Sequence, residues 1–232
     1  MPDPDQHQGL VPVIAIDGPS ASGKGTVAEQ VAHALGFHYL DSGAIYRVAT
    51  LASRKAGIAC DDETGLAALA ENLDLDFVGG RILLDRQDTT QAVRSEEAGN
   101  DASKISTLPR LRQALLSRQL AFRCQPGLVA DGRDMGSVVF PDAVLKIFLT
   151  ASVAARAERR YKQLKQKGMY ANLAAIQEDL HRRDARDSGR TAAPLIICND
   201  AVVLDTSELT VEQAVAFVLE KYQAARRATG VR

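Results

Sequence analysis

The feature that most constrains the fold of this chain is a glycine-rich loop between an apolar run and a helical pattern. The run "VPVIAID" (11–17) is rich in β-branched residues and is typical of a buried parallel strand. "GPSASGKGTV" (18–27) follows at once, and "TVAEQVAHALG" then places its apolar residues on one helical face and stops at Gly36. A strand, a glycine loop and a helix in this order predict a phosphate-binding loop.

The predicted nucleotide-binding residues are consecutive positions of this loop. Gly18 and Gly23 let backbone N–H groups converge on phosphate oxygens, and Lys24 adds a flexible positive charge for the β- and γ-phosphates. Such loops usually carry Ser or Thr directly after the lysine, but here Gly25 stands there. The full set is Gly18, Pro19, Ser20, Ala21, Ser22, Gly23, Lys24, Gly25 and Thr26. An ordinary glycine turn is the alternative, and it would leave Lys24 with nothing to hold.

Because Gly25 has no hydroxyl, we expect Mg²⁺ to be held mainly by the nucleotide's phosphates and by water. "GLVAD" (127–131) predicts a core strand that ends in a carboxylate, so Asp131 is expected to reach the ion through water. Thr26 is an additional candidate ligand. The alternative role for Asp131 is to cap a helix or a turn.

The rest of the chain alternates predicted strands and helices. Strands are predicted at 37–41, 143–151 and 201–207, and helices at about 44–55, 109–122, 152–167 and 172–186. A capping box of Thr210 and Gln213 opens a C-terminal helix. "LDLDFVGGRILLD" (73–85) predicts a hairpin, which is out of place in a parallel sheet and therefore indicates an insertion. The fold class that follows is α/β, with a parallel β-sheet flanked by helices.

Composition limits the classes of partner. The formal net charge of −1 gives no reason to expect a nucleic-acid surface. No apolar run approaches the roughly 20 residues that a membrane helix requires. The first ten residues, "MPDPDQHQGL", lack the pattern of a signal peptide. We therefore expect a cytoplasmic protein without nucleic-acid or membrane partners, whose partners are small molecules.

Four motifs together carry a resemblance. "GPSASGKGT", "LDSGAIYR" (40–47), "ADGRDMGSVVFPDA" (130–143) and "RRDARDSGR" (182–190) follow one another along the chain. This combination resembles the bacterial cytidylate kinases, which are P-loop nucleoside monophosphate kinases, from about Val11 to the C-terminus. The GKGT form of the loop is normal in that family. The resemblance implies a P-loop kinase fold with a core of 11–59, 109–154 and 191–232, an acceptor-binding insertion at 60–108, and a lid with an acceptor-contacting helix at 155–190.

The resemblance also implies the reaction: a monomer that uses ATP and Mg²⁺ to phosphorylate CMP and dCMP to CDP and dCDP. Phosphoryl transfer needs two phosphates brought into line and their charge neutralised. Lys24 and Arg190 are implied catalytic cations, and Arg156 and Arg186 are the candidates on the lid. The family's arginines on the acceptor phosphate correspond to Arg47, Arg133 and Arg190. Arg suits this task because its planar fork makes two bonds to one phosphate. For Arg156, a solvated charged face is the alternative.

Base and sugar recognition are implied in the same way. A carboxylate can accept the hydrogen of the cytosine amine, and uracil would meet it with a carbonyl. The implied base-reading residues are Asp134, Arg112 and Ser103, with Ser42 nearby. A serine on a helix surface is the alternative for Ser103. Arg183 and Asp187 are implied to hold the ribose hydroxyls, and the alternative is an ion pair between these two, four residues apart.

Two other functions remain open on the sequence. The first is a P-loop kinase for another small acceptor, such as UMP or a shikimate-like molecule, although a shikimate site has no need for a base-reading carboxylate beside Arg133. The second is a non-catalytic ATP-binding module that signals to a partner. A sensor has no use for a second phosphate site, so the arginines of the motifs argue against it.

Overall fold

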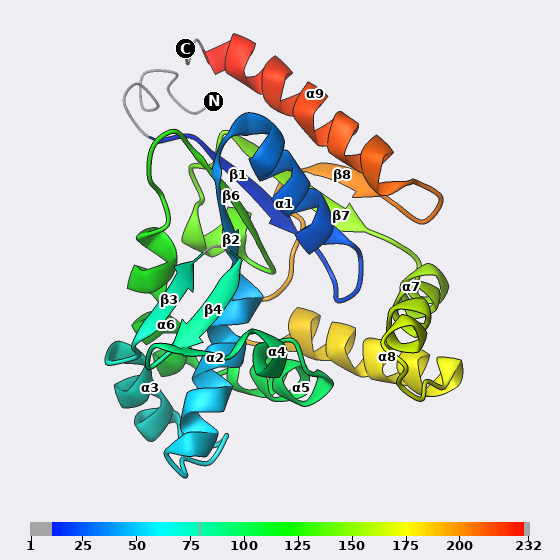
Figure 1. Ribbon diagram of the computed structural model, residues 1–232. Coiled ribbons are helices and arrows are strands. Elements are labelled where there is room, and N and C mark those ends of the chain that lie inside the picture. The colour runs from blue at the N-terminus through cyan, green and yellow to red at the C-terminus, as the bar shows by residue number, and fades with distance from the viewer. Residues whose placement is uncertain (1–10, 79, 230–232) are drawn as a thin grey trace. The chain divides into compact units, whose positions relative to one another are not determined.

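The computed structural model describes residues 11–78 and 80–229. The N-terminal stretch 1–10, on which the expectation about a signal peptide rests, and Gly79 of the predicted hairpin lie outside these ranges. The chain forms two compact units, and the colours of Figure 1 follow the chain through them. The first unit contains 11–40, 122–189 and 193–229, and the second contains 41–121 and 190–192. The insertion predicted at 60–108 lies inside the second unit, which is larger than the predicted segment at both ends.

The first unit is built on a parallel sheet. Among the described residues, this sheet has five strands in the order β2-β6-β1-β7-β8 (Figure 1). The strands are β1 (Val13–Asp17), β2 (His38–Asp41), β6 (Leu128–Gly132), β7 (Leu145–Thr150) and β8 (Val202–Asp205). β1 pairs in parallel with β6 and with β7, and β7 pairs in parallel with β8. Every residue of β1 is buried, as the continuous apolar run predicted.

Helices flank this sheet, which confirms the predicted fold class. α1 (Lys24–Leu35) and α9 (Val211–Thr229) pack against its strands, and α7 (Val153–Gln166) and α8 (Leu173–Gly189) of the same unit pack against each other. α1 and α9 lie side by side in Figure 1, and Val31 of α1 and Val218 of α9 belong to one buried cluster with Ile16 of the sheet. The predicted capping box is confirmed: the Thr210 N–H donates to Gln213 Oε1 at 2.9 Å, and the Gln213 N–H to Thr210 Oγ1 at 3.3 Å.

The second unit has its own core and its own small sheet. Its elements are α2 (Ser42–Lys55), α3 (Glu63–Glu71), β3 (Leu75–Val78), β4 (Arg81–Leu84), β5 (Gln87–Asp88), α4 (Thr90–Val93), α5 (Glu96–Ile105) and α6 (Pro109–Leu120). β3 and β4 pair antiparallel from Leu75 opposite Leu84 to Val78 opposite Arg81, which confirms the hairpin. Sequence reading assigned no helix to 63–71. The Asp62 carboxylate caps that helix by accepting the N–H of Gly65 at 2.9 Å.

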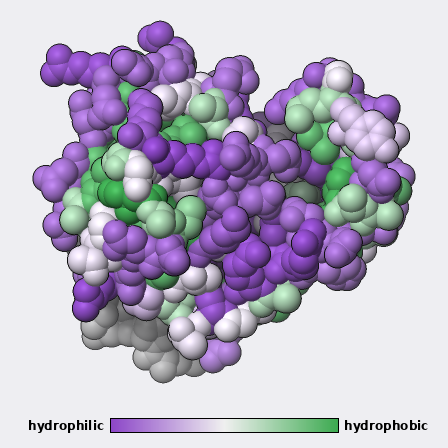
Figure 2. All heavy atoms as spheres, turned by 90° about the horizontal axis from the view of Figure 1, so that it is seen from below, coloured by the Kyte–Doolittle hydropathy of each residue, from purple (hydrophilic) through white to green (hydrophobic). Residues whose placement is uncertain are grey.

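Within the ranges that the structure describes, no helix is both long and apolar enough to cross a membrane. The face drawn in Figure 2 is mostly hydrophilic, with smaller hydrophobic areas between the polar side chains.

Candidate active site

The glycine loop connects the end of the central strand β1 to the first residue of α1, as predicted. A Cβ at Gly18 would lie 2.0 Å from the carbonyl oxygen of Leu149, so only glycine fits where the loop passes β7. Gly23 precedes the helix with φ 92°, in the left-handed region, and Ala21 also has positive φ, 59°. The backbone N–H groups at the start of α1 have no acceptor within the helix and are available to an anion.

The surroundings of Gly25 fit a hydrated magnesium ion. A Cβ at this position would lie 3.3 Å from Asp131 Oδ2 and 3.4 Å from the Tyr39 hydroxyl, so glycine leaves room beside the carboxylate. Asp131 is buried in β6, and Thr26 is exposed on the first turn of α1. Carboxylate and hydroxyl oxygens are ligands of the hard type that Mg²⁺ prefers. Among the described residues no group of three His, Cys, Asp or Glu side chains could hold a metal ion, so phosphates and water would have to complete its shell.

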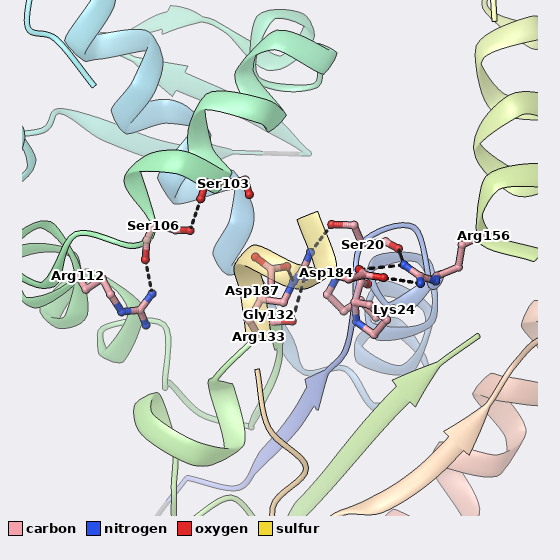
Figure 3. A network of polar contacts seen from close by, with 11 residues as sticks. Ser20, Lys24, Ser103, Ser106, Arg112, Gly132, Arg133, Arg156, Asp184 and Asp187 are labelled. Carbon is pink, nitrogen blue, oxygen red and sulfur yellow. Dashed lines mark hydrogen bonds and ion pairs between the residues drawn. The ribbon is translucent and has the colours of Figure 1, made fainter. Parts of the chain in front are cut away.

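Arg133 connects the glycine loop to α8 (Figure 3). Its Nε donates to Asp187 Oδ2 at 2.6 Å, its Nη2 to Ser20 Oγ at 2.7 Å, and its Nη1 to the Gly132 carbonyl at 3.2 Å. Burial lowers the pKa of Arg133, but the charges of Asp187 and Asp131 raise it by more, so the net pKa lies above the ordinary value. The guanidinium therefore keeps its charge although it is packed beside the loop.

Both residues of the predicted ribose pair lie on α8, and each forms an ion pair with another side chain. Asp187 is 4% exposed and binds Arg133, while Arg183 Nε lies 2.8 Å from Asp179 Oδ2. Each of the two thus has an ion-pair partner outside the predicted pair, and an ion pair between Arg183 and Asp187 stays a prediction. Arg186, on the same helix, is half-buried.

Arg156 is not on a solvated face, so that alternative from the sequence is wrong. It is 3% exposed, and its guanidinium donates to both carboxylate oxygens of Asp184, at 3.1 and 2.6 Å. It also donates to the carbonyls of Ala151 and Ser20, each at 3.0 Å. Figure 3 shows Arg156 reaching from α7 toward the loop. The first turn of α7 is therefore attached to the loop by the hydrogen bond from Arg156 to the Ser20 carbonyl, and to α8 by the ion pair with Asp184.

Sequence reading missed three residues of this network. Arg159, one turn after Arg156, donates to the Ser22 carbonyl at 3.1 Å, and the hydroxyl of the buried Thr206 donates to the same carbonyl at 3.2 Å. Asp184 is the partner of Arg156. The three-residue spacing of the two arginines would have placed both on one face of the predicted helix. Thr206 had no signal beyond its position at a strand end.

Asp17 was missed as well. It is the last residue of β1, it is 6% exposed, and its carboxylate accepts the N–H groups of Met135 and Gly136, both at 2.8 Å. Burial raises the pKa of Asp17 to about 6, although these two N–H groups act in the opposite direction. A carboxylate at the end of a predicted parallel strand, next to a glycine loop, could have indicated it.

The predicted base-reading residue Asp134 follows Arg133 in the first unit and is 4% exposed, and the remaining predicted residues belong to the second unit. Ser42 is the buried first residue of α2, whose N-cap Asp41 accepts the Ala44 N–H at 3.0 Å. Arg47 follows on the same helix and is half-buried. Ser103 is on α5, and Arg112 is on α6. The Ser106 hydroxyl donates to the Ser103 carbonyl at 3.1 Å, and Arg112 Nη1 donates to the Ser106 carbonyl at 3.1 Å (Figure 3).

Two further features of the second unit concern these residues. The Arg112 guanidinium lies 5.8 Å from the centroid of the Tyr46 ring, a cation–π arrangement. Arg190 directly follows α8 in the chain, is grouped with the second unit, and is 8% exposed. Such low exposure is uncommon for an arginine and requires partners for its N–H groups.

Comparison with known proteins agrees with the motifs. Residues 14–224 match the sequence profile of the cytidylate kinase family. A cytidylate kinase of Polynucleobacter asymbioticus is 56% identical over 93% of this chain and 98% of its own. One from Chromobacterium violaceum is 59% identical over 92% of this chain and 96% of its own. A gluconokinase structure from Sinorhizobium meliloti 1021 covers 94% of this chain and 96% of its own at 14% identity and a TM-score of 0.49, which adds nothing to the assignment. The chain belongs to the cytidylate kinase family.

Proposed function

We propose that this protein transfers the γ-phosphoryl group of ATP to CMP and dCMP, forming ADP and CDP or dCDP. Family membership supports a kinase with a pyrimidine nucleotide as acceptor. The donor, the metal ion and the role of each residue are our proposal. The predictions of a monomer and of a cytoplasmic location stay predictions.

The observation that carries the proposal is the bond from Arg133 to Ser20 of the glycine loop, at 2.7 Å. It puts an arginine of the "GRD" motif beside the loop that is proposed to hold the donor phosphates. Two phosphates repel each other, so a kinase needs cations where donor and acceptor meet. Three of the five N–H groups of Arg133 have the partners described above, and a phosphate can compete for them or use the others.

The first unit would act on both substrates. The loop N–H groups and Lys24 bind the β- and γ-phosphates and stabilise the charge that develops during transfer. Asp131 and Thr26 would contact Mg²⁺, directly or through water, and the ion would neutralise charge on the phosphates. Arg133 would bind the acceptor phosphate, and Asp134 would accept a hydrogen from the cytosine amine. No general base is required, because the acceptor phosphate is already an anion.

Other residues would have roles of their own. Arg183 and Asp187 would contact the ribose, and Arg156 and Arg186 would stabilise the transferring group. In the second unit, Arg47 and Arg190 are proposed for the acceptor phosphate. Ser42, Ser103 and Arg112 are proposed for the acceptor nucleoside. Water must be excluded during transfer, since otherwise ATP would be hydrolysed.

The test is a coupled assay of ADP release with each nucleoside monophosphate as the only acceptor. We expect turnover with CMP and dCMP, much less with UMP, and little ADP without an acceptor. Omission of Mg²⁺ should abolish turnover. Equal rates with UMP would reject the cytosine specificity, and ADP release that is independent of any acceptor would reject the kinase assignment.

A further inference from the structure

The Asp17 carboxylate, at the end of the central strand, accepts hydrogen bonds from the turn that follows Asp134. Asp17 is the last residue of β1 and directly precedes Gly18. Its Oδ1 accepts the N–H of Met135 and its Oδ2 accepts the N–H of Gly136, both at 2.8 Å. A buried carboxylate needs such donors, because loss of water disfavours its charge. Both of its oxygens are therefore bonded to consecutive amides of one turn.

That turn has an uncommon backbone conformation. Met135–Val139 form the π-helix η2, and its N-cap residue, Asp134, makes no side-chain hydrogen bond to the helix. The first N–H groups of a helix have no acceptor within it, so they need one from elsewhere. Asp17 supplies that acceptor from a neighbouring strand. It performs for η2 the task that an N-cap side chain performs in an ordinary helix.

The short segment of Arg133 and Asp134 is thereby fixed on both sides by the same residue. Before it, Gly132 is the partner of Asp17 in the parallel pairing of β1 and β6. After it, Met135 is bonded to the carboxylate of Asp17. Asp134 is 4% exposed, so its side chain is packed and cannot adapt freely if the backbone moves. Asp17 consequently constrains the backbone on both sides of Asp134.

We propose that Asp17 is a positioning residue for recognition of the acceptor base. By holding the amides of Met135 and Gly136, it aims Asp134 at the exocyclic group that distinguishes cytosine from uracil. This role rests on the proposed function, in which Asp134 reads the base. Asp17 needs no contact with the substrate for it. The loop itself is fixed from the other side, because Gly18 is in close contact with Leu149 of β7.

Ionisation of Asp17 should control this role. The ionised carboxylate accepts both amides strongly, whereas protonation places a hydrogen on one oxygen, removes the negative charge and makes that oxygen a much weaker acceptor. The charged groups that face Asp17 are Asp134, which raises its pKa, and Lys24, which lowers it. Asp17 also influences the pKa of Arg133 and of the Cys198 thiol, so these two lie within its field. Because the pKa of Asp17 is raised to about 6, the ionised form is lost as the pH falls through that value.

The first experiment compares Asp17→Asn with the unchanged protein. The amide keeps the volume but offers one acceptor oxygen and one NH₂ group, so one backbone N–H loses its partner. The quantity measured is the ratio of kcat/KM for CMP to kcat/KM for UMP. We expect this ratio to fall by about fivefold to a hundredfold, as for one buried polar mismatch, with a smaller change in the KM for ATP. A purely structural defect would lower activity on both acceptors alike.

The matched control is Asp142→Asn. Asp142 lies in the connection between β6 and β7 and forms an ion pair with Arg123 at 2.8 Å. It undergoes the same loss of charge without touching Met135 or Gly136. We expect its CMP-to-UMP ratio to equal that of the unchanged protein.

The second experiment needs no variant. The same ratio is measured on the unchanged protein from about pH 8 to about pH 5. The phosphates of CMP and UMP titrate alike, so their ionisation cancels in the ratio. We expect the ratio to decrease as the pH falls through about 6 and to be flatter in Asp17→Asn. If the Asp17→Asn variant does not fold, this pH series still tests the role of Asp17 in base recognition.

The outcomes separate the two levels of the proposal. A protein that is inactive on CMP would refute the proposed function and this role together. An active, cytosine-selective enzyme whose ratio is unchanged in Asp17→Asn, or unchanged across the pH series, would refute the role of Asp17 alone.

Discussion

The two units differ in what surrounds their arginines. In the first unit, Arg133 and Arg156 each form an ion pair of 2.6 Å with an aspartate of α8. In the second unit, Arg54 pairs with Glu97 at 3.0 Å, and its side chain is 34% exposed. Arg112 lies against a carbonyl and the ring of Tyr46. Buried pairs fix guanidinium groups in one orientation, whereas exposed pairs are screened and contribute little.

This difference indicates what each region is built for. Asp187 and Asp184 orient Arg133 and Arg156 beside the glycine loop before any phosphate arrives. Preorganised charge of this kind stabilises a transition state without reorganisation during the reaction. The ion pairs of Arg54 with Glu97 and Asp101 connect helices α2 and α5. Arg112 of α6 is held instead by the Ser106 carbonyl and the Tyr46 ring. The following predictions test this contrast, beginning with the largest expected effect.

Lys24→Met should abolish most turnover while the fold is kept. The Lys24 ammonium lies 3.5 Å from the Pro19 carbonyl, within the loop and away from the core. Loss of a cation that acts on the developing charge should reduce kcat by about 10²–10³. Steady-state ADP release measures kcat, and circular dichroism verifies the fold. Near-normal turnover would refute the proposed role of the loop.

Asp134→Asn should change acceptor preference more than total activity. The amide can turn its NH₂ group toward the carbonyl of uracil, so kcat/KM for CMP should fall and that for UMP should fall less or rise. The ratio of the two should shift by about tenfold to several-hundredfold. Asp142→Asn is again the control. An unchanged ratio would mean that Asp134 does not read the base.

Asp184→Asn and Asp101→Asn compare the two kinds of ion pair directly. The Arg156 side chain is 4% exposed and that of Asp184 is 26% exposed, so loss of this partner leaves a largely buried charge. We expect Asp184→Asn to lower the free energy of unfolding by about 1–3 kcal/mol, less than for a fully buried pair. Asp101→Asn should cost about 1 kcal/mol or less, because Arg54 is exposed. Urea unfolding measures both, and equal losses would contradict the contrast between the units.

Tyr46→Leu should have the smallest effect. It removes the aromatic face below Arg112, and a cation–π contact at such a site is worth about 0.5–1 kcal/mol. The KM for CMP should therefore rise by about two- to fivefold, with little change in the KM for ATP. Tyr46→Phe keeps the ring and is the matched control. If both variants have the same KM for CMP, the ring face does not position Arg112.

Most of the secondary structure of this protein is specified by patterns of residues that are close in sequence. The apolar run before Gly18, the capping box at Thr210 and the alternation in 73–85 each specify a structure through contacts between residues that are close in sequence. The predicted strands, the hairpin and the C-terminal helix were confirmed for that reason. Family membership could also be predicted from the sequence, because four motifs in one order identify a family more specifically than any single motif does.

The pairing of charges was decided only by the tertiary structure. Asp187 bonds to Arg133, 54 residues away in the sequence. Asp17 accepts amides from a turn 118 and 119 residues further along the chain. Local spacing shows which side chains share a helix face, but it does not show which distant strand end or helix brings a carboxylate beside a guanidinium. Parallel β1 and β6 bring these groups together because their carboxyl ends meet at one edge of the sheet, and burial there then requires that every charge has a partner.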